Sequence, residues 1–542
     1  MIFFKRSAAA ALTLTMALTA CSASTNSGAN RVNVVLTTLT PGASGPIDKV
    51  RWGVLSSEPT SFDPVKVDAA GTATVLSNLC EGLMQVQPDF SVEPNIAESY
   101  KWADPKTLVI SLRPGVTFWN GDPVTPDDVA YSLKRNMDPA NEPINAADYA
   151  KIKNVVASGK SQVTVTFTEH DSQFLDAIAA LAGAIVSKSF AESAGADFGT
   201  PKAGIMCTGP FKLTSWKTGE PIKISVNKSY WNKALTPKAK SVDFLYLDEA
   251  RLVTAIQSGE VDGAYEIPVS AVPALRRLSE GNVYFGPSTK FLVLGGLSPR
   301  GISAKPEVRR ALDLVLDKQA FVNSTLFGIG QPLKTFIPPY MFAGSPERRT
   351  YEKAYEDLGS DKQDVETARR LVKDAGAAGQ KVRIATTAGN QVQLQLVTLL
   401  QAAAKEIGLN VEIAQLSDTE ILNLFFDAKA REQYDFQVVE GYYNVPTIPS
   451  MASSIVLPHS YANMIGYDNP EATKDLKEAM SAQSPQKAAD LFVSAQKAYH
   501  EDRPLIPIAN PYQRLYMSKR IGGVPAGEYT NLPWAAFIGA TE

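Results

Sequence analysis

Residues 112–135 read LRPGVTFWNGDPVTPDDVAYSLKR, and this stretch predicts the end of a strand, two turns and a capped helix in close succession. Its apolar start belongs to the run 107–112 (TLVISL), which is typical of a strand. Turns are expected at the Pro-Gly pair 114–115 and the Asn-Gly pair 120–121, because glycine readily adopts the positive φ that many turns require. We therefore expect a strand that ends at residue 112 and a turn-rich connection after it.

The second half of the stretch carries the signals of a helix start. The hydroxyl of Thr125 can cap the helix, and Pro126 suits the first helical position. The two aspartates that follow complement the positive end of the helix dipole. Val129 and Leu133 would share one apolar face, so we expect a helix over residues 126–135.

Strand-like and helix-like patterns alternate along the rest of the chain, which indicates an α/β protein. Further strands are expected at 163–167, 222–226, 242–247 and 382–385. Helices are expected at 248–258, 306–322, 364–375, 391–407 and 486–500. Arg309 and Arg310 flank the apolar face of the second of these helices, and we expect both at the surface, solvated or in ion pairs, with contact to a ligand as the alternative.

Residues 1–20 are expected to be a lipoprotein signal peptide. Lys5 and Arg6 form a basic start, and the short apolar run after them ends in Leu-Thr-Ala-Cys, which matches a bacterial lipobox. Cleavage would expose Cys21 for lipidation, and residues 21–46 are expected to form a flexible tether. The mature protein would then be anchored to the outer face of the cell membrane without being embedded in it. A plain secretory signal with an incidental cysteine is the alternative.

Composition indicates a globular body with more than one lobe. Hydrophobic residues make up 44% of the 542 residues. The roughly 490 residues after the tether exceed one simple core, so two or three lobes are expected. The formal net charge is −3 and the sequence has no dense Lys/Arg cluster, which argues against nucleic acid as a partner, because phosphate backbones require such clusters.

Catalytic and metal-binding motifs are scarce. The three histidines, His170, His459 and His500, belong to no recognised metal or catalytic motif. The sequence also lacks a phosphate-binding loop, a nucleophile elbow and a dinucleotide-binding fingerprint. A glycosidase-like carboxylate pair stays open, since the chain has 56 acidic residues. We therefore expect no catalytic residue, no metal site and no cofactor.

Several short motifs together resemble the extracellular solute-binding proteins of peptide-type ABC importers, family 5. Residues 112–135 resemble the signature segment of that family. Further landmarks follow in the family's order over roughly residues 50–520, namely 58–64 (EPTSFDP), 80–83 (CEGL), 94–99 (PNIAES), 207–211 (CTGPF), 258–262 (SGEVD), 306–312 (PEVRRAL), 327–330 (FGIG) and 337–339 (IPP). Each motif is weak alone, and their shared order makes the resemblance specific.

This resemblance implies a periplasmic-binding-protein-like fold of the cluster C type: an α/β protein with two lobes, a hinge and an extra inserted subdomain. Lobe I would comprise residues 47–78, 204–290 and 505–542, and residues 79–203 would form the subdomain inserted into it. Lobe II would comprise residues 291–504. Lobes of this kind close around a ligand by a hinge motion.

Two cysteines remain if Cys21 is lipidated. Cys80 and Cys207 would then form an even pair in an oxidising compartment, and both lie beside family landmarks. We expect either a disulfide between them or two buried free thiols, because the sequence does not give their separation.

The resemblance also implies where a ligand binds. In the family, an extended peptide pairs its main chain with protein main chain from both lobes, which gives affinity without reading side chains. The implied ligand-binding residues are Asp68, Ala69 and Ala70 in lobe I, and Glu440, Gly441, Tyr442, Tyr443 and Asn444 at a Gly-aromatic step of lobe II. Ordinary core packing is the alternative for the two tyrosines.

One position departs from the family's pattern. Peptide binders of this type place an aspartate shortly after the Gly-aromatic step, where it pairs with the ligand's ammonium group, and Val445 stands at that position here. Glu440, Asp68 or another carboxylate pairs with the amine instead, or the ligand has no amine in this pocket. Longer or modified peptides, haem and a metal chelate all stay open as ligands.

We expect a monomeric, lipid-anchored receptor that captures di- to oligopeptides between its lobes and delivers them to an ABC permease with cytoplasmic ATPases. The same role for a non-peptide ligand is the first alternative. An exported lipoprotein hydrolase is a distant alternative, which the scarcity of catalytic motifs disfavours.

Overall fold

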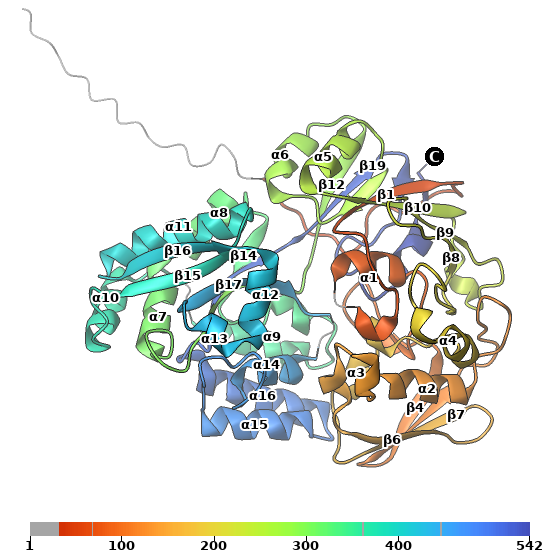
Figure 1. The fold of residues 1–542 in the computed structure, drawn as a ribbon, viewed down its shortest axis with the longest axis horizontal. Helices are drawn as coiled ribbons and strands as arrows, with labels where there is room; N and C mark the ends of the chain where they lie inside the picture. Colours follow the sequence, from red (N-terminus) through yellow and green to blue (C-terminus); the bar gives the residue numbers. More distant parts are fainter. Residues whose placement is uncertain (1–31, 68, 360–361, 445–446, 542) are drawn as a thin grey trace, which may run out of the picture.

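The computed structural model describes residues 32–67, 69–359, 362–444 and 447–541. These residues form two lobes, each built on its own β-sheet, and a subdomain with a third sheet. Lobe II lies on the left in Figure 1, lobe I at the upper right, and the subdomain below lobe I. The expected signal peptide and Cys21 lie outside the described residues.

Lobe I contains a seven-stranded sheet in the order β12-β19-β11-β1-β10-β9-β8. Its strands are β1 (Val50–Leu55), β8 (Phe211–Ser215), β9 (Ile222–Val226), β10 (Ser241–Leu247), β11 (Gly263–Tyr265), β12 (Gly281–Gly286) and β19 (Gln513–Ser518). The expected strands at 222–226 and 242–247 are confirmed as β9 and β10. Helices α1 (Ala70–Leu76), α5 (Glu249–Gln257) and α6 (Val272–Leu275) pack against this sheet.

The subdomain contains a four-stranded antiparallel sheet in the order β4-β5-β7-β6. Its main elements are β4 (Ala97–Asp104), β5 (Thr107–Leu112), α2 (Pro126–Arg135), β6 (Ile152–Ala157), β7 (Gln162–Phe167), α3 (Phe174–Ala177) and α4 (Lys188–Ala194). The strand and helix expected from residues 107–135 are thus confirmed. A capping box fixes the start of α2: the amide of Asp128 donates to the Thr125 hydroxyl (3.3 Å), and the amide of Thr125 donates to the Asp128 carboxylate (3.0 Å).

A buried ion pair joins the subdomain to lobe I. Arg135, the last residue of α2, donates two hydrogen bonds to the carboxylate of Asp63, at 2.8 and 2.6 Å. The guanidinium of Arg135 also lies 4.9 Å from the ring centroid of Phe198. A Cβ on Gly199 would come within 2.6 Å of the Asp63 backbone nitrogen, so the close approach of these segments requires glycine there.

Lobe II contains a six-stranded sheet in the order β14-β18-β13-β17-β15-β16. Its strands are β13 (Lys290–Gly296), β14 (Gly330–Pro332), β15 (Lys381–Thr387), β16 (Asn410–Leu416), β17 (Phe436–Tyr442) and β18 (Leu505–Pro511). The core on one face includes Leu292 and Leu294 and involves α7 (Pro306–Val315), α8 (Lys318–Thr325), α10 (Val365–Asp374) and α11 (Gln391–Glu406). The core on the other face includes Val293 and involves α9 (Arg348–Asp357), α14 (Ile448–Val456), α15 (Pro470–Met480) and α16 (Pro485–His500).

Two expectations for residues 306–322 are wrong. The single helix is broken into α7 and α8, because Leu316 is extended and Asp317 caps the second helix by accepting a hydrogen bond from the amide of Ala320 (2.8 Å). Arg309 is buried, only 2% exposed, and its guanidinium donates to backbone carbonyls of the neighbouring loops. Arg310 does pair with Glu501 at the surface, as expected.

Two expected boundaries also differ from the structure. Residues 505–511 form β18 in the sheet of lobe II, so the chain returns to lobe I only at Tyr512. The expected tether does not extend to residue 46, because residues 32–46 bond to the body: the amide of Val32 donates to the Phe327 carbonyl (2.9 Å) and the amide of Thr37 to the Phe285 carbonyl (2.9 Å). Apolar side chains in this segment pack on the core of lobe I, which the Ser/Thr-rich composition concealed.

A half-buried polar cluster links the two chain crossings between the lobes. Lys290 starts β13, just after the first crossing, and forms an ion pair with Glu266 at the end of β11. Arg514, just after the second crossing, lies 3.7 Å from the same carboxylate, and the Tyr529 hydroxyl donates to it at 3.0 Å. Burial alone would raise the pKa of Glu266, but the charges of Lys290 and Arg514 outweigh it and hold that pKa below its usual range.

Candidate functional site

The subdomain and lobe II touch along a seam at the bottom of Figure 1, where α3 approaches the end of α15. The amide of Ser172 and the ammonium of Lys151 both donate to the carbonyl of Met480, at 3.1 and 3.0 Å. Farther along, the side chain of Asn531 donates to the Asn444 carbonyl of lobe II (2.5 Å) and accepts from the Leu181 amide of the subdomain (3.3 Å). Two cavities open along this seam.

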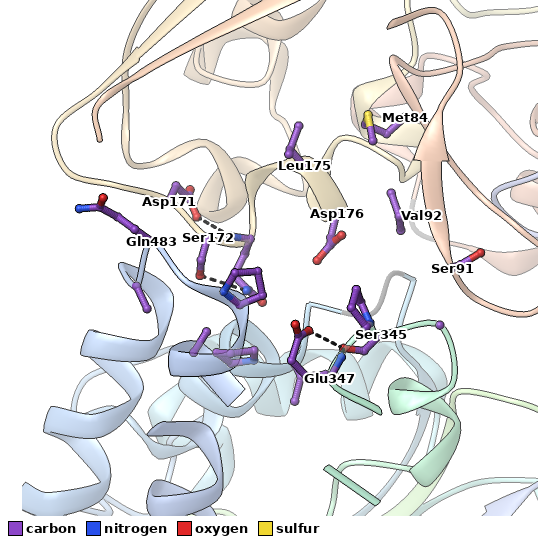
Figure 2. Close-up of a pocket in the computed structure, with 18 of the residues that line it drawn as sticks. Met84, Ser91, Val92, Asp171, Ser172, Leu175, Asp176, Ser345, Glu347 and Gln483 are labelled. Atoms are coloured by element: carbon purple, nitrogen blue, oxygen red, sulfur yellow. Dashed lines mark hydrogen bonds between the residues drawn. The ribbon is translucent and has the colours of Figure 1, made fainter. Parts of the chain in front are cut away.

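The first cavity, called here the seam cavity, has a volume of about 540 Å³. Residues 171–176 of the subdomain and residues 344–347 of lobe II form opposite parts of its wall (Figure 2). Figure 2 shows the side chains of Asp176 and Glu347 facing each other across the space, and the Ser345 hydroxyl donates to Glu347 at 3.2 Å. Burial, together with the negative charges of Glu347 and Asp171, raises the pKa of Asp176 to about 7. This cavity therefore places like charges on both sides of the seam.

The second cavity, called here the β17 cavity, has a volume of about 270 Å³. Its lobe II wall comes from β13, the end of β17, α14 and the loop around residues 461–464, and it is rich in aromatic and apolar side chains. Its opposite wall comes from the subdomain, at Asn145, Asp148 and Ala180. The cavity is thus enclosed by two bodies, as expected for a site that forms when lobes close.

Three of the residues implied by the sequence line the β17 cavity: Tyr442, Tyr443 and Asn444. Tyr443 is buried, with its ring centroid 4.7 Å from that of Phe291, and its hydroxyl donates to the Phe336 carbonyl (3.2 Å). Tyr443 therefore both forms the wall and belongs to the core of lobe II. The carbonyl of Asn444 is already held by Asn531.

Gly441 and Glu440 lie beside the cavity without lining it. A Cβ on Gly441 would come within 2.8 Å of the Phe291 ring, so packing across β13 and β17 explains the glycine at this position. Glu440 is exposed and accepts a hydrogen bond from the Asn390 side chain (3.3 Å), at the start of α11.

Of the residues implied in lobe I, the two that the structure describes lie outside both cavities. Ala69 precedes α1 and Ala70 begins it, and neither lines the seam cavity or the β17 cavity. Asp68 lies outside the described residues, as does Val445, the position where the family's aspartate was expected.

Sequence reasoning missed the carboxylate that does line the β17 cavity, Asp148. This residue lies in a short helical turn, Ala146–Tyr149, between α2 and β6. Nothing in the local sequence distinguishes it from the other acidic residues of the subdomain, because its position depends on a contact between distant parts of the chain. Burial, together with the charge of Asp171, raises the pKa of Asp148 to about 6.

The other expected features have structural positions away from the cavities. Cys80 and Cys207 form a disulfide, with their Cα atoms 5.0 Å apart. Beside it, the buried carboxylate of Glu81 accepts hydrogen bonds from the hydroxyls of Thr208 (2.8 Å) and Tyr230 (2.7 Å). This segment therefore fastens the base of the subdomain to lobe I.

No group of three or more His, Cys, Asp or Glu side chains is placed to hold a metal ion among the residues that the structure describes. Within the same residues, no helix combines the length and the apolar character needed to cross a bilayer.

The sequence matches a family model along most of the described body. The model of the bacterial extracellular solute-binding proteins, family 5, middle region, matches residues 91–463. The glutathione-binding protein GsiB of Salmonella typhi is 24% identical over 462 residues, which cover 83% of this chain and 86% of that protein. The periplasmic oligopeptide-binding protein OppA of Salmonella typhimurium is 25% identical over 499 residues, which cover 88% of each.

Solved structures share the fold. The oligopeptide-binding protein AppA of Bacillus subtilis, determined in complex with a nonapeptide, has a TM-score of 0.74 to this structure at 18% identity. The match covers 92% of this chain and 100% of that one. At this identity the likeness concerns the fold, and it agrees with the two-lobed α/β architecture expected from the sequence.

Proposed function

Because the chain belongs to the bacterial extracellular solute-binding proteins of family 5, we propose that it is the peptide receptor of an ABC importer. It captures a di- to oligopeptide between its lobes and delivers the peptide intact to the membrane-embedded permease. The β17 cavity is the observation that carries this proposal. Lobe II and the subdomain each form part of its wall, and the end of β17 lines it.

The chemistry of the β17 cavity suits a peptide with varied side chains. Aromatic rings and the flexible side chains of Met451 and Met464 provide apolar contact with little demand on ligand shape. The backbone around Gly441–Asn444 and the segment at Ala69–Ala70 are the proposed edges for main-chain pairing with an extended ligand. Relatives named for binding glutathione and oligopeptides support a peptide as the ligand class.

A lipid anchor is part of the proposal. Cys21 follows a lipobox, so processing would leave a lipidated cysteine ahead of the body and place the receptor on the outer face of the cell membrane. Cys21→Ala should shift the protein from the membrane fraction to the soluble exported fraction. Unchanged membrane retention of that variant, measured by fractionation and immunoblotting, would contradict lipidation at Cys21.

Native mass spectrometry tests the ligand class directly. The protein is purified without denaturation from its natural host and from a neutral expression host, then incubated with a synthetic peptide mixture. We expect intact peptides to co-purify and to remain uncleaved during the incubation. Cleaved products would instead support a hydrolase, and retention of a non-peptide ligand alone would replace the peptide assignment.

A further inference from the structure

The β17 cavity has an unbalanced charge. Asp148 is an acidic residue in its lining, and no Lys, Arg or His side chain lines it among the described residues. The remaining wall is aromatic, apolar or neutral and polar. A site of this composition attracts a cation or a neutral group and repels an anion.

Among the described residues, the carboxylate of Asp148 has no partner. Within the described part of the chain it forms no hydrogen bond and no ion pair, although its residue is half-buried. The neighbouring charged group, Asp171, repels it, and its charge also acts on the hydroxyl of Tyr461 at the cavity wall. A partly buried carboxylate without a partner is unfavourable, and a bound cation would relieve that penalty.

The charge and the aromatic wall belong to different bodies. Asp148 belongs to the subdomain, whereas Phe291, Tyr442 and Tyr461 belong to lobe II. A cation seated between them would bond to the carboxylate on one side and contact aromatic faces on the other. Such a ligand would hold the two sides of the seam together, which a neutral analogue would do less well.

We propose that the β17 cavity receives the cationic head of the ligand, an alkylammonium or guanidinium group, and that Asp148 pairs with it from the subdomain side. This inference rests on the proposed function and deepens it, because it assigns the charge of the ligand and the residue that pairs with that charge. Asp148 would then do the work of the aspartate that related peptide binders carry after the Gly-aromatic step of lobe II. Closure of the seam would depend on the charge of the ligand.

Two matched probe pairs test this pairing. The first is a synthetic tripeptide mixture with free amino termini and the same mixture N-acetylated. The second is phenethylamine and its neutral counterpart 2-phenylethanol. Affinities are measured by native mass spectrometry for the peptides and by ligand-observed NMR for the small probes, with wild-type protein and the Asp148→Asn variant.

For each probe pair that binds, we expect the wild-type protein to have a higher affinity for the charged member than for the neutral one. Asp148→Asn should weaken binding of the charged members by about 10- to 100-fold, and binding of the neutral members by less than about twofold. Glu98→Gln is the matched control, because it removes an equal charge from an exposed position on β4 that lines neither cavity. The melting temperature of neither variant should fall below that of the wild type, which excludes misfolding as the cause.

A second readout follows from the ionisation of Asp148. The titratable groups near it are Asp171, Tyr149 and Tyr461, of which only Asp171 ionises in the acidic range. Affinity for the charged probes should therefore rise between pH 5 and pH 7 in the wild type, since the probes keep their charge over this range, and it should change much less in Asp148→Asn.

The outcomes separate the two proposals. If free-amine peptides bind but Asp148→Asn weakens both forms equally or neither, the charge assignment is overturned while the peptide receptor stands. If peptides fail to bind but phenethylamine binds in an Asp148-dependent way, the charge assignment stands and the peptide assignment falls. If neither amine binds better than its neutral counterpart, the inference is overturned.

Discussion

At the scale of single residues, the structure gives most of the buried charges a fixed partner. Arg135 takes both oxygens of Asp63, and Lys290 pairs with Glu266 at the crossing between the lobes. Such pairs are costly to break, because the remaining charge stays buried. The carboxylates along the seam are different, since Asp148 and Asp176 face like charges or none. Under the proposed function, the paired charges stabilise the scaffold, and the carboxylates that have no partner among the described residues lie where ligand binding and lobe motion would act.

The Asp63–Arg135 pair provides the first test at this scale. Asp63→Asn should lower the free energy of unfolding by about 3–5 kcal/mol, because the guanidinium of Arg135 would stay buried without its counter-charge. Chemical denaturation measures the change. Asp127→Asn is the control, because Asp127 is an exposed aspartate on α2, the helix that also carries Arg135. A loss no larger than that of the control would show that the pair does not fasten the subdomain.

Asp176 should make the stability of the seam depend on pH. Its folded-state pKa of about 7 lies above that of an unfolded aspartate, so the folded protein disfavours the charged form. Stability is therefore complete below about pH 4 and is lost as the pH rises towards 7. Asp176→Asn should leave the melting temperature unchanged at pH 4 and raise it at pH 8, where the gain is at most about 4 kcal/mol and is reduced by solvent screening of this partly exposed side chain.

Thermal melts at both pH values measure this difference. A gain for Asp176→Asn that is equal at pH 4 and pH 8 would contradict the assignment, because a neutral packing effect would not depend on ionisation.

At the scale of elements, the sequence predicted what local signals determine. The Thr125 cap and the apolar spacing around Val129 located α2, and the run 107–112 located β5, because caps and periodicity are local. The break at Leu316 was missed, since an unbroken apolar spacing hid the capping role of Asp317. The place of β18 in lobe II was missed because strand pairing is decided between distant segments.

The same reasoning applies to the candidate site. Tyr442, Tyr443 and Asn444 were implied by the family resemblance, through its Gly-aromatic step, and they do line a cavity. Asp148 could not be predicted, because it reaches that cavity only through the packing of the subdomain against lobe II. Local sequence thus predicts which residues form a wall, and tertiary packing decides which charge faces it.

The packing of β17 on β13 gives an element-scale prediction. Gly441→Ala should lower the free energy of unfolding by about 1–3 kcal/mol, because the new methyl group would collide with the Phe291 ring. Gly295→Ala on β13 is the control, since the nearest atom to its Cβ would lie at 3.4 Å, an ordinary contact. In a Phe291→Ala background the effect of Gly441→Ala should largely disappear, and an undiminished effect would exclude this collision as the cause.

At the scale of the whole molecule, two lobes meet through two chain crossings and a seam. The crossings carry the half-buried Glu266 cluster, while the seam carries cavities and repelling carboxylates. We therefore expect the crossings to persist and the seam to open when ligand enters or leaves. A ligand that bonds to both sides of the seam favours the closed arrangement, because its binding free energy adds only when the sides meet. The central claim is that this protein captures a peptide by closing its two lobes around it.

Small-angle X-ray scattering tests that claim most directly. The radius of gyration is measured for protein stripped of ligand and for the same protein saturated with a peptide identified by native mass spectrometry. The account predicts a smaller radius with peptide, and a return to the larger radius when the peptide is removed. A peptide that binds tightly while the radius of gyration stays the same would contradict capture by closure.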